Sequence, residues 1–474
     1  MDWFSDPGYW PSRWVFQRGL GLVYLVAFLT AANQFRALIG EHGLTPAPRY
    51  LRGRSFREVP SLFAFGYSDR RFAVVAWVGV ALSVAALVGA FDQLPLPVCM
   101  ALWAVLWVLY LSIVNIGQIW YGFGWESLLL EVGFLAIFLG SAATEPPVLV
   151  LWLLRWVLFR VEFGAGLIKI RGDPCWRNLT CLYYHHETQP MPNPLSWYFH
   201  HLPKPLHRIE VAGNHFAQLV VPFGLFAPQP VAGIAAAIIV VTQCWLLLSG
   251  NFSWLNWVTI VLGLSVIPGA WYSVLPISAP EFDDTPAWFV VVVIAVTALV
   301  VVLSYRPARN LLSSHQKMNA SFDKLHLVNT YGAFGRVTRT RFEVVLEGCH
   351  DTETAHEPEW KEYQFKGKPV DLHRMPRQFA PYHLRLDWLM WFAALSPDYA
   401  RTWLPRLADK LLENDVDTLK LLRGNPFADQ RPDRVRATLY EYHFTDRAER
   451  RRTGAWWTRD RIGTYLVPVR RPAE

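Results

Sequence analysis

Long apolar segments occupy the first two thirds of the chain. Nine of them predict membrane-spanning helices, because a bilayer core of about 30 Å requires about 20 mostly apolar residues per helix. They lie near residues 14–33, 71–91, 97–114, 123–141, 147–169, 209–227, 231–249, 252–275 and 286–305. Some connections are very short, such as Asp92 to Leu96, so neighbouring spans should pair as antiparallel hairpins. The pattern predicts an α-helical multi-pass membrane bundle of about nine spans.

The pattern changes at about residue 306, beyond which charged residues are frequent and no stretch is apolar enough to span a membrane. Alternating apolar and polar positions predict three strands in this tail, and helical spacing predicts two helices. The strands are Arg341–Gly348, Trp360–Lys366 and Arg434–Thr445, and the helices are Leu386–Leu395 and Arg401–Leu422. A change of apolar face near Leu439 favours a bulge or bend there. We predict a transmembrane helical domain, residues 1–305, and a C-terminal soluble α+β or β-rich domain, residues 306–474.

The composition fits this division. The chain is 53% hydrophobic, carries 23 tryptophans and has a formal net charge of +7, which is typical neither of a soluble globular protein nor of a disordered chain. Five cysteines are too few and too scattered for a disulfide scaffold. The first apolar run is too long for a cleavable signal peptide and should anchor the chain. The aromatic and basic residues of the tail favour a packed sheet over a nucleic-acid surface, so no nucleic-acid partner is expected.

Basic residues are concentrated on one side of the predicted membrane domain. They follow the first, fifth and last spans, whereas loops on the other side carry acidic residues such as Asp92 and Glu145. The positive-inside rule then places the long loops and the tail in the cytoplasm and the N-terminus outside.

The segment Glu162–His201 concentrates the polar chemistry of the chain. It leaves the fifth apolar segment and carries histidines, tyrosines, cysteines, amides and a proline-rich end. In a chain that is mostly hydrocarbon, so many groups able to hydrogen bond, titrate or bind a ligand indicate a functional site. Lys169, at the mouth of a cavity, could act as a base with Glu162, His185 and His186 as partners. The alternative is a structural polar network, which is the more common role of intramembrane charges.

Charged residues inside the fourth and fifth spans should pair, because a bare charge in the bilayer is costly. If these spans form a hairpin, Glu131 lies at about the depth of Arg160, which predicts a structural ion pair between them. Arg155, Glu162 and Lys169 recur every seven residues and therefore fall on one stripe of the fifth helix.

Metal binding is not expected in the Glu162–His201 segment. His185 and His186 are adjacent, which is not a recognised ligand spacing, and the cysteines do not form a CxxC pair. The tail has no serine-hydrolase elbow, phosphate-binding glycine loop or zinc-protease helix, and we predict neither a metal nor a cofactor. Cys175 and Cys181 could form a short disulfide if the segment faces an oxidising compartment, whereas they would be thiols in the cytoplasm.

Several runs of the sequence carry a family resemblance. They are Gly43–Ala47, Tyr50–Leu51, Pro60–Phe63, Gly122–Ser127, Phe163–Lys169 with Trp176, and Tyr183–Pro194, and in the tail Asn329–Gly335, Phe342–Gly348, Trp360–Phe365, Pro376–His383 and Leu386–Trp388. Together they cover almost the entire chain, which resembles the lipase maturation factor family. Its best-known animal members are endoplasmic-reticulum membrane proteins needed for folding and dimer assembly of secreted lipases. The resemblance implies a lipase or other exported client, and a tail that faces the lumen instead of the cytoplasm.

The membrane half is also distantly similar to vitamin K-dependent gamma-carboxylases. Their catalytic lysine lies in a similar Ala-Gly-x-x-Lys run, which would correspond to Ala165, Gly166 and Lys169 here. The large lumenal portion of those carboxylases is not evident in this chain. The similarity implies a membrane enzyme that acts on a lipid-like substrate.

Two functional hypotheses follow. The first is a multi-pass maturation factor, or chaperone, that binds an exported client such as a lipase through the Glu162–His201 segment and exposed aromatic residues of the tail. The second is a membrane-embedded enzyme with Lys169 as base. A lipid-accessible cavity at Lys169 that holds a bound lipid would favour the enzyme, and a closed ion-pair network would favour the maturation factor. Either protein is integral to the bilayer: the plasma or inner membrane of a prokaryote, or the endoplasmic reticulum of a eukaryote.

Overall fold

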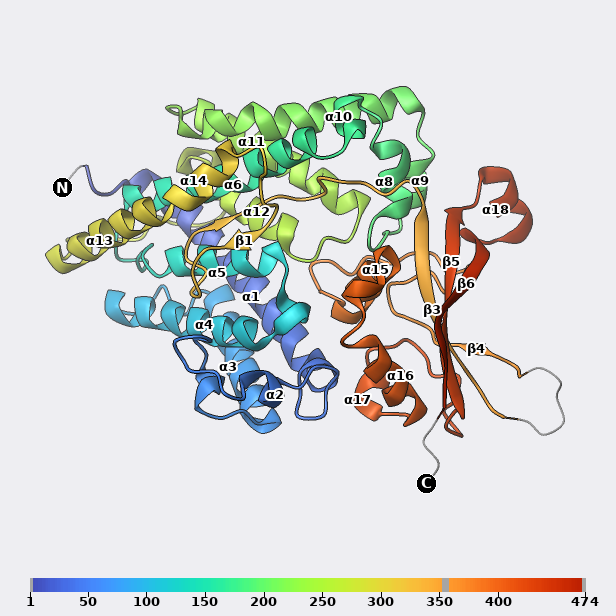
Figure 1. Cartoon of the computed structure of the whole chain (residues 1–474). Coiled ribbons are helices and arrows are strands. Elements are labelled where there is room, and N and C mark those ends of the chain that lie inside the picture. Colours follow the sequence, from blue (N-terminus) through green and yellow to red (C-terminus); the bar gives the residue numbers. More distant parts are fainter. Residues whose placement is uncertain (1–2, 352–357, 471–474) are drawn as a thin grey trace.

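The computed structural model describes residues 3–351 and 358–470, and it has a helical part and a strand-containing part (Figure 1). The helical part has one helix in each region where the sequence predicts a membrane span. These helices are α1 (Trp10–Leu38), α3 (Asp69–Leu87), α4 (Leu96–Ile116), α5 (Gly124–Ala136), α6 (Val148–Arg171), α10 (Lys204–Leu219), α11 (Val231–Ser249), α12 (Leu255–Leu264) and α13 (Ala287–Leu303). Shorter helices are α2 (Ala47–Leu51), α7 (Pro174–Arg177), α8 (Leu182–Thr188), α9 (Ser196–His200) and α14 (Tyr305–Leu312).

Five candidate spans are long and apolar enough to cross a membrane. They are α1 with the turn before it, α3, α4, α11, and α13 continued by α14. By contrast, α12 has 10 residues, which extend over only about 15 Å. α6 has 24 residues, but Arg155, Arg160 and Glu162 interrupt its apolar character. The protein is therefore a mostly helical, multi-pass membrane protein, with five of the nine predicted spans meeting this criterion in the described residues.

Exposed apolar side chains on the candidate spans form the surface that meets lipid. Val291, Val301 and Val302 are exposed on α13, and Val74 and Trp77 are exposed on α3. Soluble proteins rarely expose so much apolar surface, because it would contact water. In a bilayer this surface is matched by lipid, and the helices bury their other faces against one another, as α1 does against α3.

The strand-containing part is built on an antiparallel sheet of four strands in the order β4-β3-β5-β6. The strands are β3 (Arg341–Cys349), β4 (Lys361–Glu362), β5 (Arg434–Phe444) and β6 (Trp457–Arg470), and a separate pair consists of β1 (Ala320–Ser321) and β2 (Asn329–Thr330). The helices of this part are α15 (Arg385–Leu395), α16 (Leu404–Leu412), α17 (Val416–Leu419) and α18 (Arg447–Thr453). The predicted strands at β3 and β5 and the predicted helix at α15 are confirmed.

Three details of the tail differ from the sequence prediction or refine it. The helix predicted over residues 401–422 is broken, because Asn414 adopts a left-handed φ of 52° and Asp415 caps the next helix by accepting from the Thr418 amide. The strand predicted at 360–366 is only two residues long. The expected irregularity near Leu439 is confirmed, since the pairing of β5 with β6 shifts register between Leu439 and Tyr440.

Strand β6 was not predicted. After Trp457 it has a run of polar residues, Thr458 to Arg461, and it contains Gly463 and Pro468, all of which weaken a strand pattern. Half of its residues are exposed and only one is buried, because it lies at the edge of the sheet and only β5 pairs with it among the described strands. Edge strands need less apolar alternation than central strands, and periodicity alone does not detect them.

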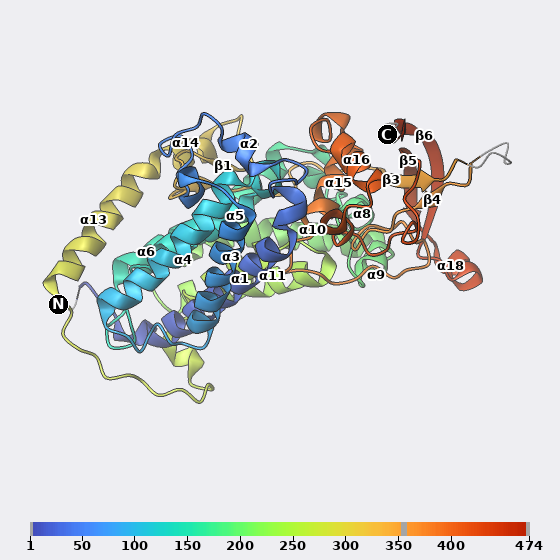
Figure 2. The same ribbon diagram turned by 90° about the horizontal axis from the view of Figure 1, so that it is seen from below.

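The tail packs directly onto the helical part. One continuous apolar core includes residues of both, and the chain between α14 and β3 runs back along the helices (Figure 2). Gln34 on α1 donates to the His383 carbonyl at 2.7 Å and accepts from the Arg385 amide at 3.2 Å. The four-stranded sheet lies at the end of the molecule opposite α13 (Figure 2).

Candidate functional site

The segment that follows α6 is fixed by local capping and by the tail. Asp173 accepts from the Cys175 amide at 3.0 Å, which caps α7. Cys175 and Cys181 are joined by a disulfide, with their Cα atoms 4.8 Å apart. The Asp173 carboxylate also accepts from Arg339 of the tail at 2.8 Å. The segment and the tail therefore lie on the same side of the molecule and form one surface.

Lys169 and Glu162 lie on α6 within one polar network. The Lys169 amine donates to the Gln218 side-chain carbonyl of α10 at 2.6 Å. Glu162 accepts from the Gln243 amide of α11 at 2.5 Å, and the Gln243 carbonyl accepts from Asn256 of α12 at 2.6 Å. All are buried. The network therefore ties together four helices through amide and charged groups.

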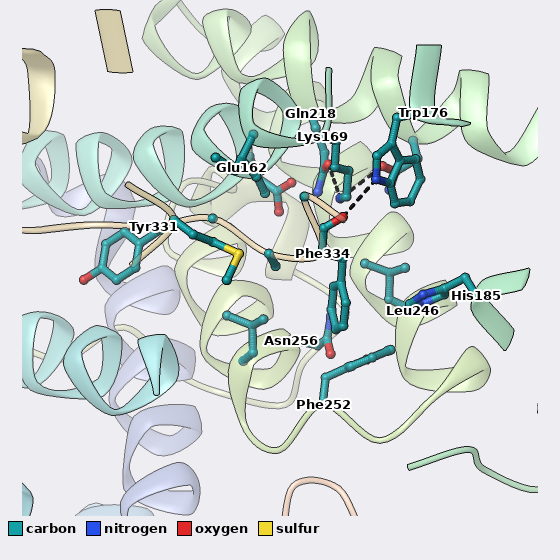
Figure 3. A pocket seen from close by; sticks show the side chains of 18 of the residues that line it. Glu162, Lys169, Trp176, His185, Gln218, Leu246, Phe252, Asn256, Tyr331 and Phe334 are labelled. Atoms are coloured by element: carbon teal, nitrogen blue, oxygen red, sulfur yellow. Dashed lines mark hydrogen bonds between the residues drawn. The ribbon is translucent and has the colours of Figure 1, made fainter. Parts of the chain in front are cut away.

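A cavity of about 1250 Å³ opens beside this network. Figure 3 shows Glu162 and Lys169 on one side of it and Phe252 and Asn256 on the other. Most of its lining is apolar or aromatic, including Trp176, Leu246, Phe252, Phe334 and Trp388. The exposed residues Ile209, Phe216 and Val241 also line it, so it opens between α10 and α11. A large apolar cavity with a few buried polar groups is the usual form of a small-molecule site.

All four predicted catalytic candidates line this cavity. The His185 ring packs edge-on against the Phe334 ring, with the two ring centres 5.1 Å apart. Burial, assisted by the Lys169 charge, lowers the pKa of His185 to about 4. His185 is therefore neutral at pH 7. The His186 ring is buried and stacks on the Phe199 ring, with the two ring centres 5.4 Å apart. The amine, the carboxylate and the two imidazoles therefore border one cavity, and their catalytic roles stay a prediction.

Glu131 and Arg160 form a buried ion pair between α5 and α6. The same carboxylate accepts from the Asn329 amide at 2.9 Å and from the Tyr331 hydroxyl at 2.6 Å. Arg160 also donates to the Asn329 carbonyl at 2.6 Å. The helical hairpin thus holds β2 of the tail. Sequence reasoning placed the two charges at one depth but did not indicate Asn329 or Tyr331 as partners.

Arg155 lies one turn and a half before Arg160 on α6 and has different partners. Its guanidinium donates to the Tyr9 hydroxyl at 2.8 Å and to the Leu225 carbonyl at 3.3 Å. Arg155 is therefore not part of the polar network of Glu162 and Lys169, although the three residues recur every seven positions on α6.

A second buried ion pair joins the two parts of the chain. Arg385 of α15 donates to Glu126 of α5 at 2.7 Å, and both side chains are fully buried. The Tyr110 hydroxyl also donates to Glu126. Beside them, burial and the Arg385 charge lower the pKa of His383 to about 4, so its ring is neutral at pH 7. Sequence reasoning missed this pair because the two partners are 259 residues apart.

The two tryptophans near the end of the tail are buried. Trp456 and Trp457 are buried in a cluster with Trp197 of the segment that follows α6. The Trp197 indole donates to the Thr445 carbonyl at 2.8 Å, and the Arg450 guanidinium lies 3.4 Å from the centre of the Trp456 ring. These aromatics hold the segment and the tail together.

Comparison with known proteins adds a family assignment. The family described as lipase maturation factor transmembrane domain matches residues 11–273, and that described as lipase maturation factor C-terminal domain matches residues 327–468. The chain is 42% identical to lipase maturation factor 1 of Bos taurus, over 98% of this chain and 90% of that protein. It is 42% identical to the Homo sapiens protein of the same name, over 97% and 88%, and 29% identical to lipase maturation factor 2 of Gallus gallus, over 96% and 81%. No solved structure matches.

Proposed function

Because the chain belongs to the lipase maturation factor family, we propose that it is a multi-pass membrane factor that assists exported lipases to reach their active fold. The similarity at 42% identity over nearly the whole length carries this proposal. The structure is in keeping with it, since the buried Arg385–Glu126 ion pair joins the two matched regions into one body, and Asn329 and Tyr331 of the second region donate to Glu131 of the first. A body of this kind can present a fixed surface to a client.

The outer edge of β6 is the client contact that we favour. This strand of 14 residues has no pairing partner on its outer side among the described strands. Ile462 and Val467 are 52% and 68% exposed on it. An open strand edge can pair with an extended segment of another chain through backbone hydrogen bonds, with apolar side chains adding affinity. A partly folded lipase offers such segments, so the edge replaces the exposed aromatics as the expected contact.

The tail faces an oxidising compartment in this proposal. The disulfide between Cys175 and Cys181 lies in the segment that packs on the tail, and disulfides persist outside the reducing cytoplasm. We give the disulfide more weight than the positive-inside rule, which placed the tail in the cytoplasm, because that rule is weak for long loops and domains. The oxidising compartment would be the endoplasmic-reticulum lumen of a eukaryote or the periplasm of a prokaryote.

We also place α5, α6, α10 and α12 at membrane depth. Together with the five candidate spans they give nine membrane segments. Residues 1–305 and 306–474 are two functional units in this proposal.

Cysteine counting tests this orientation. Protein denatured directly from membranes without a reductant should react with a maleimide-polyethylene glycol at three cysteines, Cys99, Cys244 and Cys349, and at all five after reduction. Five modified cysteines without reduction would place the segment in a reducing compartment and contradict the orientation.

A membrane enzyme remains the second candidate, and the cavity is the observation that favours it. Lys169 and Glu162 meet an apolar space that is open between α10 and α11, where a lipid-like substrate could enter. In this alternative Lys169 would act as the base toward that substrate. The Gln218 contact holds the amine at 2.6 Å, which serves a structural lysine equally well.

Two variants separate the candidates when lipase maturation is measured as the specific activity of a co-expressed, secreted lipase. We expect Lys169→Met to retain most of the maturation activity, because a maturation factor needs no base. Val467→Lys should lower it several-fold, since a lysine on an edge strand opposes pairing with another chain. Val416→Lys, at a site 67% exposed on α17, is the matched control and should have no effect. Loss with Lys169→Met at normal protein level, and no loss with Val467→Lys, would support the enzyme instead.

A further inference from the structure

Three side chains capable of binding a metal converge between α8 and α10. His186 comes from α8, and His207 and Glu210 come from α10, three residues apart on the same helix. One ligand atom from each lies within 4.8 Å of the others. Residues three apart on a helix share one face, so the second histidine and the carboxylate point to the same side toward α8.

Each of the three groups has a free ligand atom. His186 is only 1% exposed, yet neither of its ring nitrogens has a hydrogen-bond partner in the described part of the chain. The His207 Nε2 lies 3.4 Å from the His200 carbonyl, which leaves Nδ1 without a partner among the same residues. The Glu210 Oε1 accepts from the Trp245 indole at 2.7 Å, and the other oxygen can bind a metal. A buried imidazole without any partner is costly, and a metal ion would satisfy one of the two ring nitrogens of His186.

The outer contacts match those of known metal sites. Metal-binding histidines usually donate their second ring nitrogen to a carbonyl or carboxylate, and metal-binding carboxylates are themselves hydrogen bonded. The His200 carbonyl and the Trp245 indole fill these roles for His207 and Glu210. Trp245 is 44% exposed near the C-terminal end of α11, so the site lies close to the surface of the molecule.

From this arrangement we propose that His186, His207 and Glu210 bind a Zn²⁺ ion. Two imidazoles and one carboxylate are a common zinc ligand set, whereas Ca²⁺ and Mg²⁺ favour oxygen ligands alone. Ligand atoms of a tetrahedral zinc site are about 3.4 Å apart, so small side-chain rotations complete the geometry from the present positions. Because His186 and Glu210 also line the large cavity, a fourth ligand position would be accessible from it. The site would also fix α8 against α10.

The sequence pointed away from a metal because the candidates considered were the adjacent His185 and His186 with Glu187 and His200 or His201, a set without a recognised ligand spacing. In the structure the His185 ring packs on Phe334 and the His186 ring on Phe199, and α10 supplies the other two ligands. The His-x-x-Glu spacing of His207 and Glu210 was the feature of the sequence that could have indicated a metal site. The third ligand, His186, could be found only from the packing of α8 on α10.

Zinc content of the purified full-length protein tests this site. The protein is purified without a histidine tag, treated with a chelator, incubated with zinc sulfate and desalted, and the bound metal is measured by mass spectrometry. We expect one zinc per chain in the unmodified protein. His207→Gln and Glu210→Gln should weaken zinc affinity by at least about 100-fold, since even the outer partners of a metal site contribute 10–100-fold.

His215→Gln is the matched control, because His215 lies on the same helix and its ring contacts the Trp176 carbonyl instead. It should bind zinc as the unmodified protein does. Zinc should also raise the thermal unfolding midpoint of the unmodified protein and of His215→Gln, but not of the two ligand variants, whose metal-free midpoints show that they are folded. Absence of stoichiometric zinc, or equal binding by all four proteins, would overturn the proposal.

Discussion

Replacing Arg160 with leucine is expected to destabilise the protein by about 3–5 kcal/mol, the usual cost of removing one partner of a buried ion pair. Glu131 would remain buried with hydrogen bonds from Asn329 and Tyr331 but without its cation. The β2 strand of the tail would also lose the bond from Arg160 to the Asn329 carbonyl. We therefore expect release of residues 329–331 from the helical hairpin, detectable as faster hydrogen exchange there.

The matched control is Arg155→Leu on the same helix. Arg155 is also buried, but it bonds a hydroxyl and a carbonyl, so its removal leaves no carboxylate unpaired and should cost clearly less. The double variant Glu131→Leu/Arg160→Leu should recover much of the stability lost in the single variant, because neither charge is then left alone. Equal losses for Arg160→Leu and Arg155→Leu in thermal unfolding would show that the pair has no special role.

Replacing Arg385 with leucine should have a comparable effect at a different boundary, again of about 3–5 kcal/mol. Its guanidinium reaches Glu126 at 2.7 Å and the Trp120 carbonyl at 2.6 Å, and it lies 3.5 Å from the centre of the Tyr121 ring. All of these partners belong to the helical part. The variant should therefore loosen α15 and residues 380–384 from α5 while the sheet itself stays folded.

Limited proteolysis measures this loosening directly, with cleavage expected near α15 in the variant and not in the unmodified protein. Arg401→Leu is the control, because its ion pair with Asp398 is exposed and such pairs contribute little. If Arg385→Leu resists proteolysis as well as Arg401→Leu does, the two parts of the chain are held together by their apolar contacts and not by this pair.

The positions of the helices and of the Glu131–Arg160 contact were within reach of the sequence. Long apolar runs specify helices in a bilayer, and two consecutive helices joined by a short turn bring residues of equal depth together. The same reasoning predicted nine spans, of which five are long and apolar enough to cross a membrane among the described residues. The prediction at α12 covers a helix of only 10 residues, whose flanking apolar residues continue in turns.

Contacts between the tail and the helices could not be found from sequence patterns. Arg385 and Glu126 meet across 259 residues, and neither the spacing nor the hydropathy of α15 indicates a carboxylate inside the membrane part. The edge strand β6 and the site of His186, His207 and Glu210 depend in the same way on which elements pack together. Local patterns therefore predicted the elements, and tertiary packing decided the site.

The most direct test of the account is the specific activity of an exported lipase secreted by cells that lack their own maturation factor, with and without this protein. Lipase activity per mass of secreted lipase should rise several-fold when the protein is present in the membrane. If the specific activity is unchanged although the protein is inserted and folded, its role as a lipase maturation factor is contradicted.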